Sequence, residues 1–125
     1  MIGIDLCSAS RIRHVHERHG QAFESRVFTR GEVEHAFRRR DPWPHLAARW
    51  AAKEAVFKVI GRVPGFRWTD VEVLSRDGPP RLALHGETEI AARRMGLRAW
   101  HVSITHEGDT AACVVLALPA GDGKR

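Results

Sequence analysis

The sequence predicts an α+β domain in which mostly antiparallel strands pack around one long buried helix. Two pairs of strand-like segments each flank a short turn rich in glycine, proline or aspartate, which is typical of antiparallel hairpins. One helical pattern, over residues 45–60, is apolar on nearly every side, as expected of a helix covered by other elements. The chain has 125 residues, which is enough for one domain. We expect that domain over residues 1–118 and a disordered tail over residues 119–125.

The first strand and helix are predicted from alternation and capping. Residues 1–6 alternate between apolar and other side chains, which indicates a strand. Ser8 or Ser10 is suited to cap a helix over residues 11–19, and Gly20 is expected to end that helix.

Two further helices are predicted before the middle of the chain. Thr29 and Glu32 have the spacing of a capping box and open a short helix that ends in the three arginines at residues 38–40. The two prolines within residues 41–44 are expected to break the chain. The long helix over residues 45–60 follows, and a glycine stops it.

The second half of the chain contains two hairpins separated by a helix. Glycine and proline at residues 77–80 form the first predicted turn, and residues 107–109 form the second. The helix is expected at residues 87–95, and the strands at residues 68–74, 81–84, 101–105 and 110–118.

Composition excludes several classes of protein. No apolar run approaches the roughly 20 residues that a membrane helix needs, and the first residues lack the basic leader of a signal peptide. Cys7 and Cys113 are too few and too far apart for a disulfide framework or a zinc cluster. We interpret them as small apolar residues in a cytoplasmic protein.

The charge balance indicates a class of partner. The chain carries 20 lysines and arginines against 15 carboxylates, a net charge of +5. A basic surface favours a polyanion, which leaves nucleic acid, an acidic protein and a phosphate-rich small molecule open. The alternative is that most of these arginines are solvated surface residues without a specific partner.

Glu54 and Asp5 are carboxylates in apolar surroundings. Glu54 lies in the long apolar helix, where a charge is costly unless it is compensated. An ion pair with Lys58 at i,i+4 would be sufficient. Asp5 lies in the first strand beside Gly3, which is expected to leave open space around the carboxylate. Asp5 could instead cap the helix that begins near Ser8.

Two isolated carboxylates on different elements suggest a site for a hard cation. Mg²⁺ prefers oxygen ligands and is often held by one or two carboxylates together with substrate phosphates. A pyrophosphate would supply the remaining oxygens. Arg49, Lys53 and Lys58 lie on the same helix as Glu54 and could neutralise that pyrophosphate.

The strand over residues 101–106 carries a third candidate. His106 ends the strand at the predicted turn, where a side chain reaches a cleft easily, although it could also be an exposed turn histidine. His101 and His106 do not make a zinc site, since no further ligand has suitable spacing.

Taken in order along the chain, these segments resemble a known family. They are residues 3–5, 11–12, 28–32, 49–55 with Lys58 and Gly61, 70–73, 78–82 and 101–106. Together they resemble the holo-acyl-carrier-protein synthase family, the small trimeric class of 4′-phosphopantetheinyl transferases. The resemblance covers nearly the whole chain and implies the transferase-like fold of that family.

The resemblance implies a reaction. A serine of an apo acyl carrier protein attacks the β-phosphate of coenzyme A, the 4′-phosphopantetheine arm moves to the serine, and 3′,5′-ADP leaves. In such phosphoryl transfer, positioning and charge neutralisation carry most of the catalysis. By resemblance, Asp5 and Glu54 hold Mg²⁺, and Lys58 belongs with them to the catalytic set. Glu54, or a metal-bound water that it activates, is the expected general base.

By the same resemblance, the remaining site residues bind coenzyme A. Arg49, Lys53 and Lys58 balance its phosphates, and Gly61, Thr105 and His106 line its site. The turns at residues 61–65 and 78–80 depart from the family pattern where nucleotide contacts are expected.

The family also implies partners. It predicts a homotrimer with active sites between subunits, and a basic first helix that docks the acidic carrier. Arg11 and Arg18 are seven residues apart, hence on one helical face, with His14 between them. Electrostatic steering of the carrier would then use the positive charge.

Two rival functions remain. One is a catalytically inactive trimeric family member that only binds the carrier or coenzyme A. The other is a basic nucleic-acid-binding domain, which is disfavoured because Trp50 and Trp100 lie in segments expected to be buried and no recognition motif is present. We expect neither nucleic acid nor membrane as a partner.

Overall fold

The computed structural model describes residues 1–75 and 78–120. Its helices are α1 (Ala9–Val27), α2 (Arg30–Phe37), α3 (Trp43–Ile60) and α4 (Gly86–Arg94), with a 3₁₀ turn, η1, at Trp68–Asp70. Its strands are β1 (Ile2–Ser8), β2 (Val71–Leu74), β3 (Arg81–Leu84), β4 (Leu97–Glu107) and β5 (Thr110–Pro119). One sheet has the order β1-β5-β4, and β2 pairs with β3 in a second sheet. The described pairings are all antiparallel, which confirms the predicted fold class.

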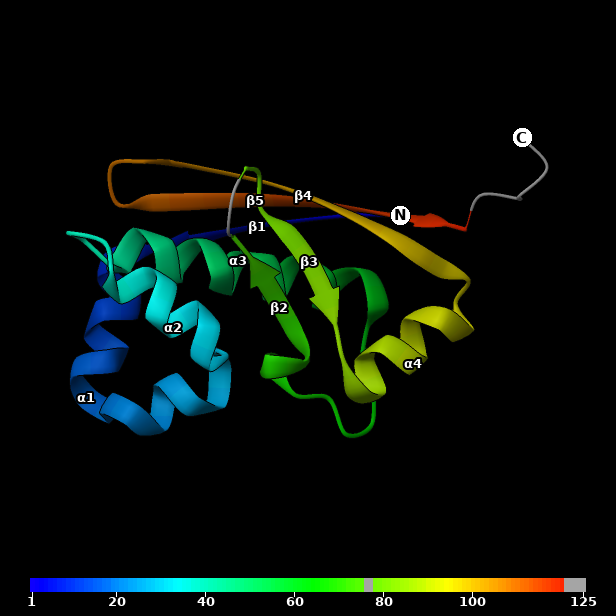
Figure 1. Ribbon diagram of the computed structural model, residues 1–125, viewed down its shortest axis with the longest axis horizontal. Helices are drawn as coiled ribbons and strands as arrows, with labels where there is room; N and C mark the ends of the chain where they lie inside the picture. Colours follow the sequence, from blue (N-terminus) through cyan, green and yellow to red (C-terminus); the bar gives the residue numbers. More distant parts are fainter. Residues whose placement is uncertain (76–77, 121–125) are drawn as a thin grey trace.

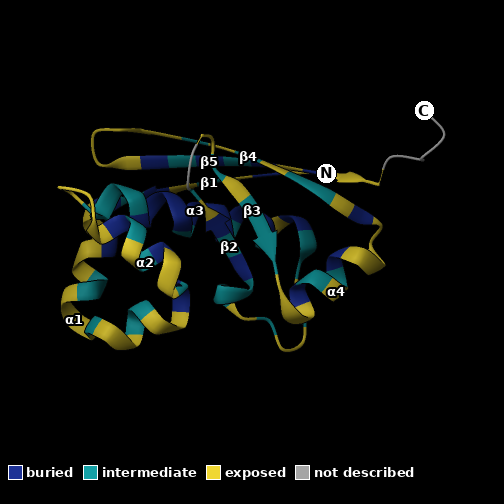
Figure 2. Ribbon diagram, in the orientation of Figure 1, coloured by how far each residue is buried: buried dark blue, intermediate teal, exposed yellow. Residues whose placement is uncertain are grey.

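Helix α3 is the centre of the structure. It runs along one face of the three-stranded sheet, with α1 and α2 gathered near one of its ends and the β2–β3 hairpin on another side (Figure 1). Its buried residues face in several directions, so Figure 2 shows dark blue along most of its length. The prediction of a helix buried on most sides is confirmed. Many of these residues are alanines, which allows neighbouring backbones to approach closely.

Gly3 shows how close that approach is. A Cβ atom at Gly3 would lie 2.2 Å from the backbone oxygen of Ala55 in α3. No side chain fits there, so glycine is required for β1 to pack on the helix. The expectation that Gly3 leaves open space beside Asp5 was therefore wrong, because the helix backbone fills that space.

Several boundaries differ from the prediction. Gly20 does leave the helical conformation, with φ 55° and ψ −132°, but the chain resumes a helix directly and α1 reaches Val27. Prolines are tolerated in a first helical turn, so α3 begins at Trp43 instead of after the proline pair. The expected strand over residues 68–74 begins only at Val71, after the 3₁₀ turn. Residue 77 of the first predicted turn and residues 121–125 of the expected tail lie outside the described residues.

The predicted caps are present. The Ser8 hydroxyl accepts a hydrogen bond from the Arg11 amide at the start of α1, so the alternative in which Asp5 caps this helix does not hold. At α2, Thr29 and Glu32 form the reciprocal capping box.

The three-stranded sheet has one face that α3 leaves open. Apolar side chains of β1 and β5 project from it, with exposed fractions between 38% and 71%: Ile2, Ile4, Leu6, Leu116 and Leu118. None of the described helices is long and apolar enough to span a bilayer. Cys7 and Cys113 lie on the covered side, where burial raises their thiol pKa values to about 11 and about 12. Both thiols are therefore unreactive, in line with their interpretation as small apolar residues.

Candidate active site

Asp5 and Lys58 form a polar contact between β1 and α3. The Lys58 ammonium donates to Asp5 Oδ1 at 2.9 Å and to the backbone oxygen of Ile4 at 2.9 Å. The Asp5 side chain is 17% exposed and the Lys58 side chain 54% exposed. The ion pair of Lys58 is thus made with Asp5 and not with Glu54 on its own helix.

Glu54 lies close enough to Asp5 for the two charges to repel each other. Burial raises the pKa of the Glu54 carboxyl, and the negative charge of Asp5 raises it further. The positive charges of Lys58 and Arg11 oppose this effect only in part. The structure therefore brings the two predicted carboxylates into one cluster, with incomplete neutralisation within the described part of the chain.

The donor set of this cluster fits Mg²⁺. The described residues contain no group of three or more histidines, cysteines and carboxylates that could hold a metal ion by themselves. Asp5 and Glu54 offer two carboxylates, which is the donor set of a magnesium ion that takes its other oxygens from phosphates and water. A divalent cation would also relieve the repulsion between the two carboxylates.

Lys53 has a different place from the one predicted. Its side chain is fully buried, and its ammonium lies 2.8 Å from Glu32 Oε1. It also donates to the backbone oxygens of Trp68, at 3.1 Å, and Val71. Three acceptors in the core satisfy the three ammonium hydrogens, so none remains for a ligand. The structure does not support Lys53 as a phosphate ligand.

Arg49 is the centre of a second cluster, which is positively charged. Its side chain is 4% exposed and donates to the His45 backbone oxygen at 3.1 Å and to Ser75 Oγ at 3.0 Å. Arg49 Nε has no hydrogen-bond partner among the described residues. An unsatisfied buried donor is costly, so this nitrogen is suited to an added acceptor such as a phosphate oxygen.

The pKa values of two histidines reflect the positive charge of this second cluster. Burial lowers the pKa of His45, and the positive charges of Arg49, Arg39 and His106 lower it further. His35 is affected in the same way, and its ring centroid lies 5.8 Å from that of His45. Positive charges from α3, from the segment after α2 and from the end of β4 therefore converge on one region.

Sequence reasoning did not identify His45 and Arg39 as members of this cluster. His45 precedes Arg49 by four residues on one helix face, and that spacing could have indicated a shared site. Arg39 is one of three arginines at the end of a predicted helix, where cations are favourable to the helix dipole, and it therefore gave no distinct signal.

Thr105 and His106 lie on opposite faces of the sheet. In the register, His106 is paired with Ala111 and Thr105 with Ala112. Side chains alternate along a strand, so His106 projects toward the side of α3, where it influences His45, and Thr105 projects from the open face. The two side chains therefore reach a ligand from different faces of the strand, although both line one hollow at its end together with Glu107, Thr110 and Ala112.

Helix α1 carries the predicted docking residues Arg11, His14 and Arg18, and all three are exposed. Ile12, which is 3% exposed, lies about 100° around the helix axis from Arg11 and anchors the helix in the core. Within one chain the helix therefore presents a basic surface that is free to meet an acidic partner.

The other predicted residues divide into two groups. Asp5, Glu54 and Lys58 form the first group, and Arg49 and His106 belong to the second. Glu54 is five residues beyond Arg49 on α3, which places the two side chains about 140° apart around the helix axis. Gly61, with φ 82°, ends α3 just beyond Lys58. A single chain does not bring all of these residues around one small ligand.

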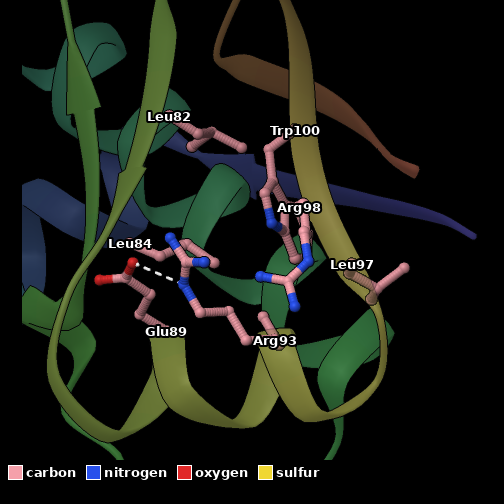
Figure 3. A pocket seen from close by; sticks show the side chains of 8 residues that line it. Leu82, Leu84, Glu89, Arg93, Leu97, Arg98 and Trp100 are labelled. Atoms are coloured by element: carbon pink, nitrogen blue, oxygen red, sulfur yellow. Dashed lines mark hydrogen bonds and ion pairs between the residues drawn. The ribbon is translucent and has the colours of Figure 1, made fainter. Parts of the chain in front are cut away.

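A separate hollow lies between β3, α4 and β4, with a volume near 170 Å³ (Figure 3). Leu82, Leu84 and Trp100 line it, and the Arg93 side chain donates to Glu89 at 3.1 Å across its edge. None of the predicted site residues lines this hollow.

Comparisons with known proteins place the sequence in a family over most of its length. The family model described as the 4′-phosphopantetheinyl transferase superfamily matches residues 1–115. The holo-[acyl-carrier-protein] synthase of Myxococcus xanthus is 39% identical over 122 residues, which cover 97% of this chain and 96% of the relative. The synthase of the same name from Desulforudis audaxviator is 40% identical over 126 residues and covers 99% and 96%.

Solved structures show the same fold. The crystal structure of the holo-[acyl-carrier-protein] synthase from Neisseria meningitidis superposes with a TM-score of 0.81 at 29% identity, covering 94% of this chain and 96% of that chain. The Chronobacterium ammoniagenes structure described as an ACPS–CoA complex superposes with a TM-score of 0.78 at 31% identity, covering 97% and 98%.

Proposed function

The chain belongs to the 4′-phosphopantetheinyl transferase superfamily, and we propose that it is a holo-acyl-carrier-protein synthase, as its relatives are named. It transfers the 4′-phosphopantetheine arm of coenzyme A to a serine of an apo acyl carrier protein and releases 3′,5′-ADP. The observation that supports this most strongly is the pair of mutually repelling carboxylates, Asp5 and Glu54, beside Lys58. We expect the reaction in the cytoplasm.

Asp5 and Glu54 would hold Mg²⁺. The ion supplies electrostatic stabilisation of the charge that develops on the diphosphate. Lys58 holds the Asp5 carboxylate from the helix side and places a half-exposed positive charge next to the same diphosphate. These three residues form the proposed catalytic set.

Glu54 is the proposed general base. Its pKa is raised by burial and by Asp5 while no cation is bound, and a bound cation would lower it, so the role of base rests on the position of Glu54 beside Asp5 and Lys58 and not on the raised pKa. As the serine oxygen bonds to the β-phosphorus, the bond between that phosphorus and the bridging oxygen breaks. The electron pair leaves on 3′,5′-ADP, and the serine proton passes to Glu54.

The second, positive cluster is the proposed site for another phosphate of coenzyme A. Arg49 Nε is a buried donor without a partner among the described residues. Burial and then the positive charges of Arg49, Arg39 and His106 lower the pKa of His45, which indicates excess positive charge in this region. Gly61 and Thr105 would contact coenzyme A from the end of α3 and from the open sheet face.

A homotrimer would bring the two groups of site residues together between subunits. The chain leaves an apolar sheet face exposed, with Ile2 at 71% and Leu6 at 65%, and such a face is favourable to bury between subunits. Thr105 projects from the same face, so a neighbouring copy packed there would receive it. We therefore propose active sites between subunits, in which the carboxylate cluster of one subunit faces the Thr105 strand of another.

The acidic carrier would dock on α1. Arg11, His14 and Arg18 are exposed on this helix, and Arg11 is close enough to Glu54 to influence its pKa. A carrier held at Arg11 would thus lie near the reacting groups. Opposite charges on the two proteins would raise the rate of encounter.

The test is to incubate the protein with coenzyme A, Mg²⁺ and an apo acyl carrier protein and to weigh the carrier by mass spectrometry. We expect a mass gain of one phosphopantetheine arm on the carrier serine, abolished by a chelator. A carrier that binds without gaining mass would support the rival function, an inactive binding module. Tighter binding of mixed DNA or RNA than of the carrier, at equal salt, would support a nucleic-acid-binding domain.

A further inference from the structure

The turn between β4 and β5 is fastened to the first turn of α1. Four hydrogen bonds from residues 8–10 end on Asp109. Its backbone oxygen accepts from the Ala9 amide at 2.7 Å, and its carboxylate accepts from the Ser10 amide at 2.9 Å and from the Ser8 and Ser10 hydroxyls at 2.6 Å each. We call this set of contacts the Asp109 clamp.

The Asp109 clamp completes the cap of α1 from a distant part of the chain. Ser8 Oγ accepts from the Arg11 amide at 3.2 Å while it donates to Asp109. The amides of Ala9, Ser10 and Arg11 therefore all have acceptors, two of them supplied by a residue about 100 positions away. A negative charge at a helix N-terminus is also favourable to the helix dipole. The hydrogen bonds from Ser10 and Ser8 lower the pKa of Asp109, so its carboxylate stays ionised well into the acidic range.

This contact joins three of the elements that carry the proposed machinery, which also includes α3. Asp5 lies three residues before Ser8 on β1, Arg11 lies three residues after it on α1, and His106 lies three residues before Asp109 on β4. The β4–β5 turn and the start of α1 lie at the same end of the molecule (Figure 1). The clamp thus fixes α1, on which the carrier is proposed to dock, relative to the strands that carry Asp5 and His106.

We infer that Asp109 is a positioning residue, which sets the placement of the docked carrier relative to coenzyme A. This inference rests on the proposed function. Transfer requires the serine oxygen to approach the β-phosphate in line with the bond that breaks. The carrier and coenzyme A are each held by different elements of the protein. A displacement of about 1 Å between reacting groups is enough to lower a rate about a hundredfold. Asp109 itself is not proposed to contact either substrate.

The test compares Asp109→Ala and Asp109→Asn with the unsubstituted protein. For Asp109→Ala we expect kcat to fall about tenfold or more, because the relative placement relaxes, while the separate dissociation constants for coenzyme A and for the carrier change less than twofold. Asp109→Asn keeps an acceptor for the Ser10 amide and should recover most of the rate. Hydrogen exchange should quicken at the Ser10 and Arg11 amides in Asp109→Ala.

Thr29→Ala is the matched control, since it removes the side-chain cap of α2 at a comparable cost in stability. It should leave kcat unchanged at a temperature where all variants are folded. An equal fall in kcat for Thr29→Ala and Asp109→Ala would overturn the inference, as would a kcat for Asp109→Ala within twofold of the original. Lost carrier affinity with unchanged kcat would make Asp109 a docking residue instead. Absence of transfer by the unsubstituted protein would refute the proposed function itself, and this inference with it.

Discussion

Replacement of Lys53 by methionine distinguishes a core lysine from a phosphate ligand. Lys53 and Glu32 form an ion pair at 2.8 Å in which both side chains are fully buried. Methionine keeps most of the hydrocarbon volume but removes the charge. Glu32 would still accept from the backbone amides of Thr29, at 2.8 Å, and Val73, at 2.9 Å, yet its negative charge would be buried without a counter-ion.

Removal of one partner from a buried ion pair costs about 3–5 kcal/mol. At roughly 4 °C per kcal/mol for a domain of this size, the melting temperature of Lys53→Met should fall by roughly 12–20 °C. The double variant Lys53→Met with Glu32→Gln should regain more than half of the loss, because the remaining side chain is neutral. Urea unfolding measures the loss of unfolding free energy in both variants. It is done at one fixed protein concentration, since association would make stability concentration-dependent.

Lys58→Met is the matched control, the same substitution five residues later in the same helix. Lys58 is half exposed, so its stability change should stay within about 1 kcal/mol, whereas transfer should be lost. Coenzyme A affinity of the folded Lys53→Met protein, measured by calorimetry at low temperature, should be unchanged. A normal urea midpoint combined with weaker coenzyme A binding would refute this reasoning and restore Lys53 as a phosphate ligand.

The other predictions concern the proposed site and its partners. Asp5→Asn and Glu54→Gln should each abolish transfer while the circular dichroism spectrum stays unchanged; retained activity in both would remove the site assignment. Because the pKa of Glu54 is raised while no cation is bound, protons should compete with Mg²⁺ for this carboxylate, so Mg²⁺ affinity measured by calorimetry should fall as the pH drops through that raised value, above the ordinary 4.5; an affinity independent of pH in this range would contradict the pairing of Glu54 with Asp5 at the metal site. Charge reversal at Arg11 and Arg18 should weaken carrier binding, by calorimetry, more than coenzyme A binding, and equal losses would contradict docking on α1. Leu6→Asp on the open sheet face should convert a trimer to monomers in light scattering, whereas an unchanged mass would exclude this face as the interface.

Local signals in the sequence were sufficient for most of the secondary structure. The capping box at Thr29 and Glu32 involves atoms within four residues, and the structure contains it. Gly20 was read correctly as a break, because its positive φ is a local property. That the chain continues as a helix after the break depends on tertiary contacts. Phe23 beyond the break packs against the core, and no short-range pattern encodes that contact.

The candidate site shows the same limit more clearly. Lys53 and Lys58 lie five residues apart in one apolar helix, and the sequence alone assigned both to phosphates. In the structure Lys53 meets Glu32 from α2 in the core, whereas Lys58 emerges beside Asp5. Their different places are set by which neighbouring element covers each side of α3. That information arises only when the elements are assembled.

The packing of α3 also determines the spacing of the proposed catalytic carboxylates. Gly3 brings the backbone of β1 into direct contact with Ala55, the residue after Glu54. Asp5 is two positions along the strand from Gly3 and so projects from the same face, toward the helix. The Asp5–Glu54 pair is therefore held where the backbones of β1 and α3 are in close contact. Such a support suits a site whose catalysis depends on placement of charge, because a preorganised pair needs little rearrangement as the reaction proceeds.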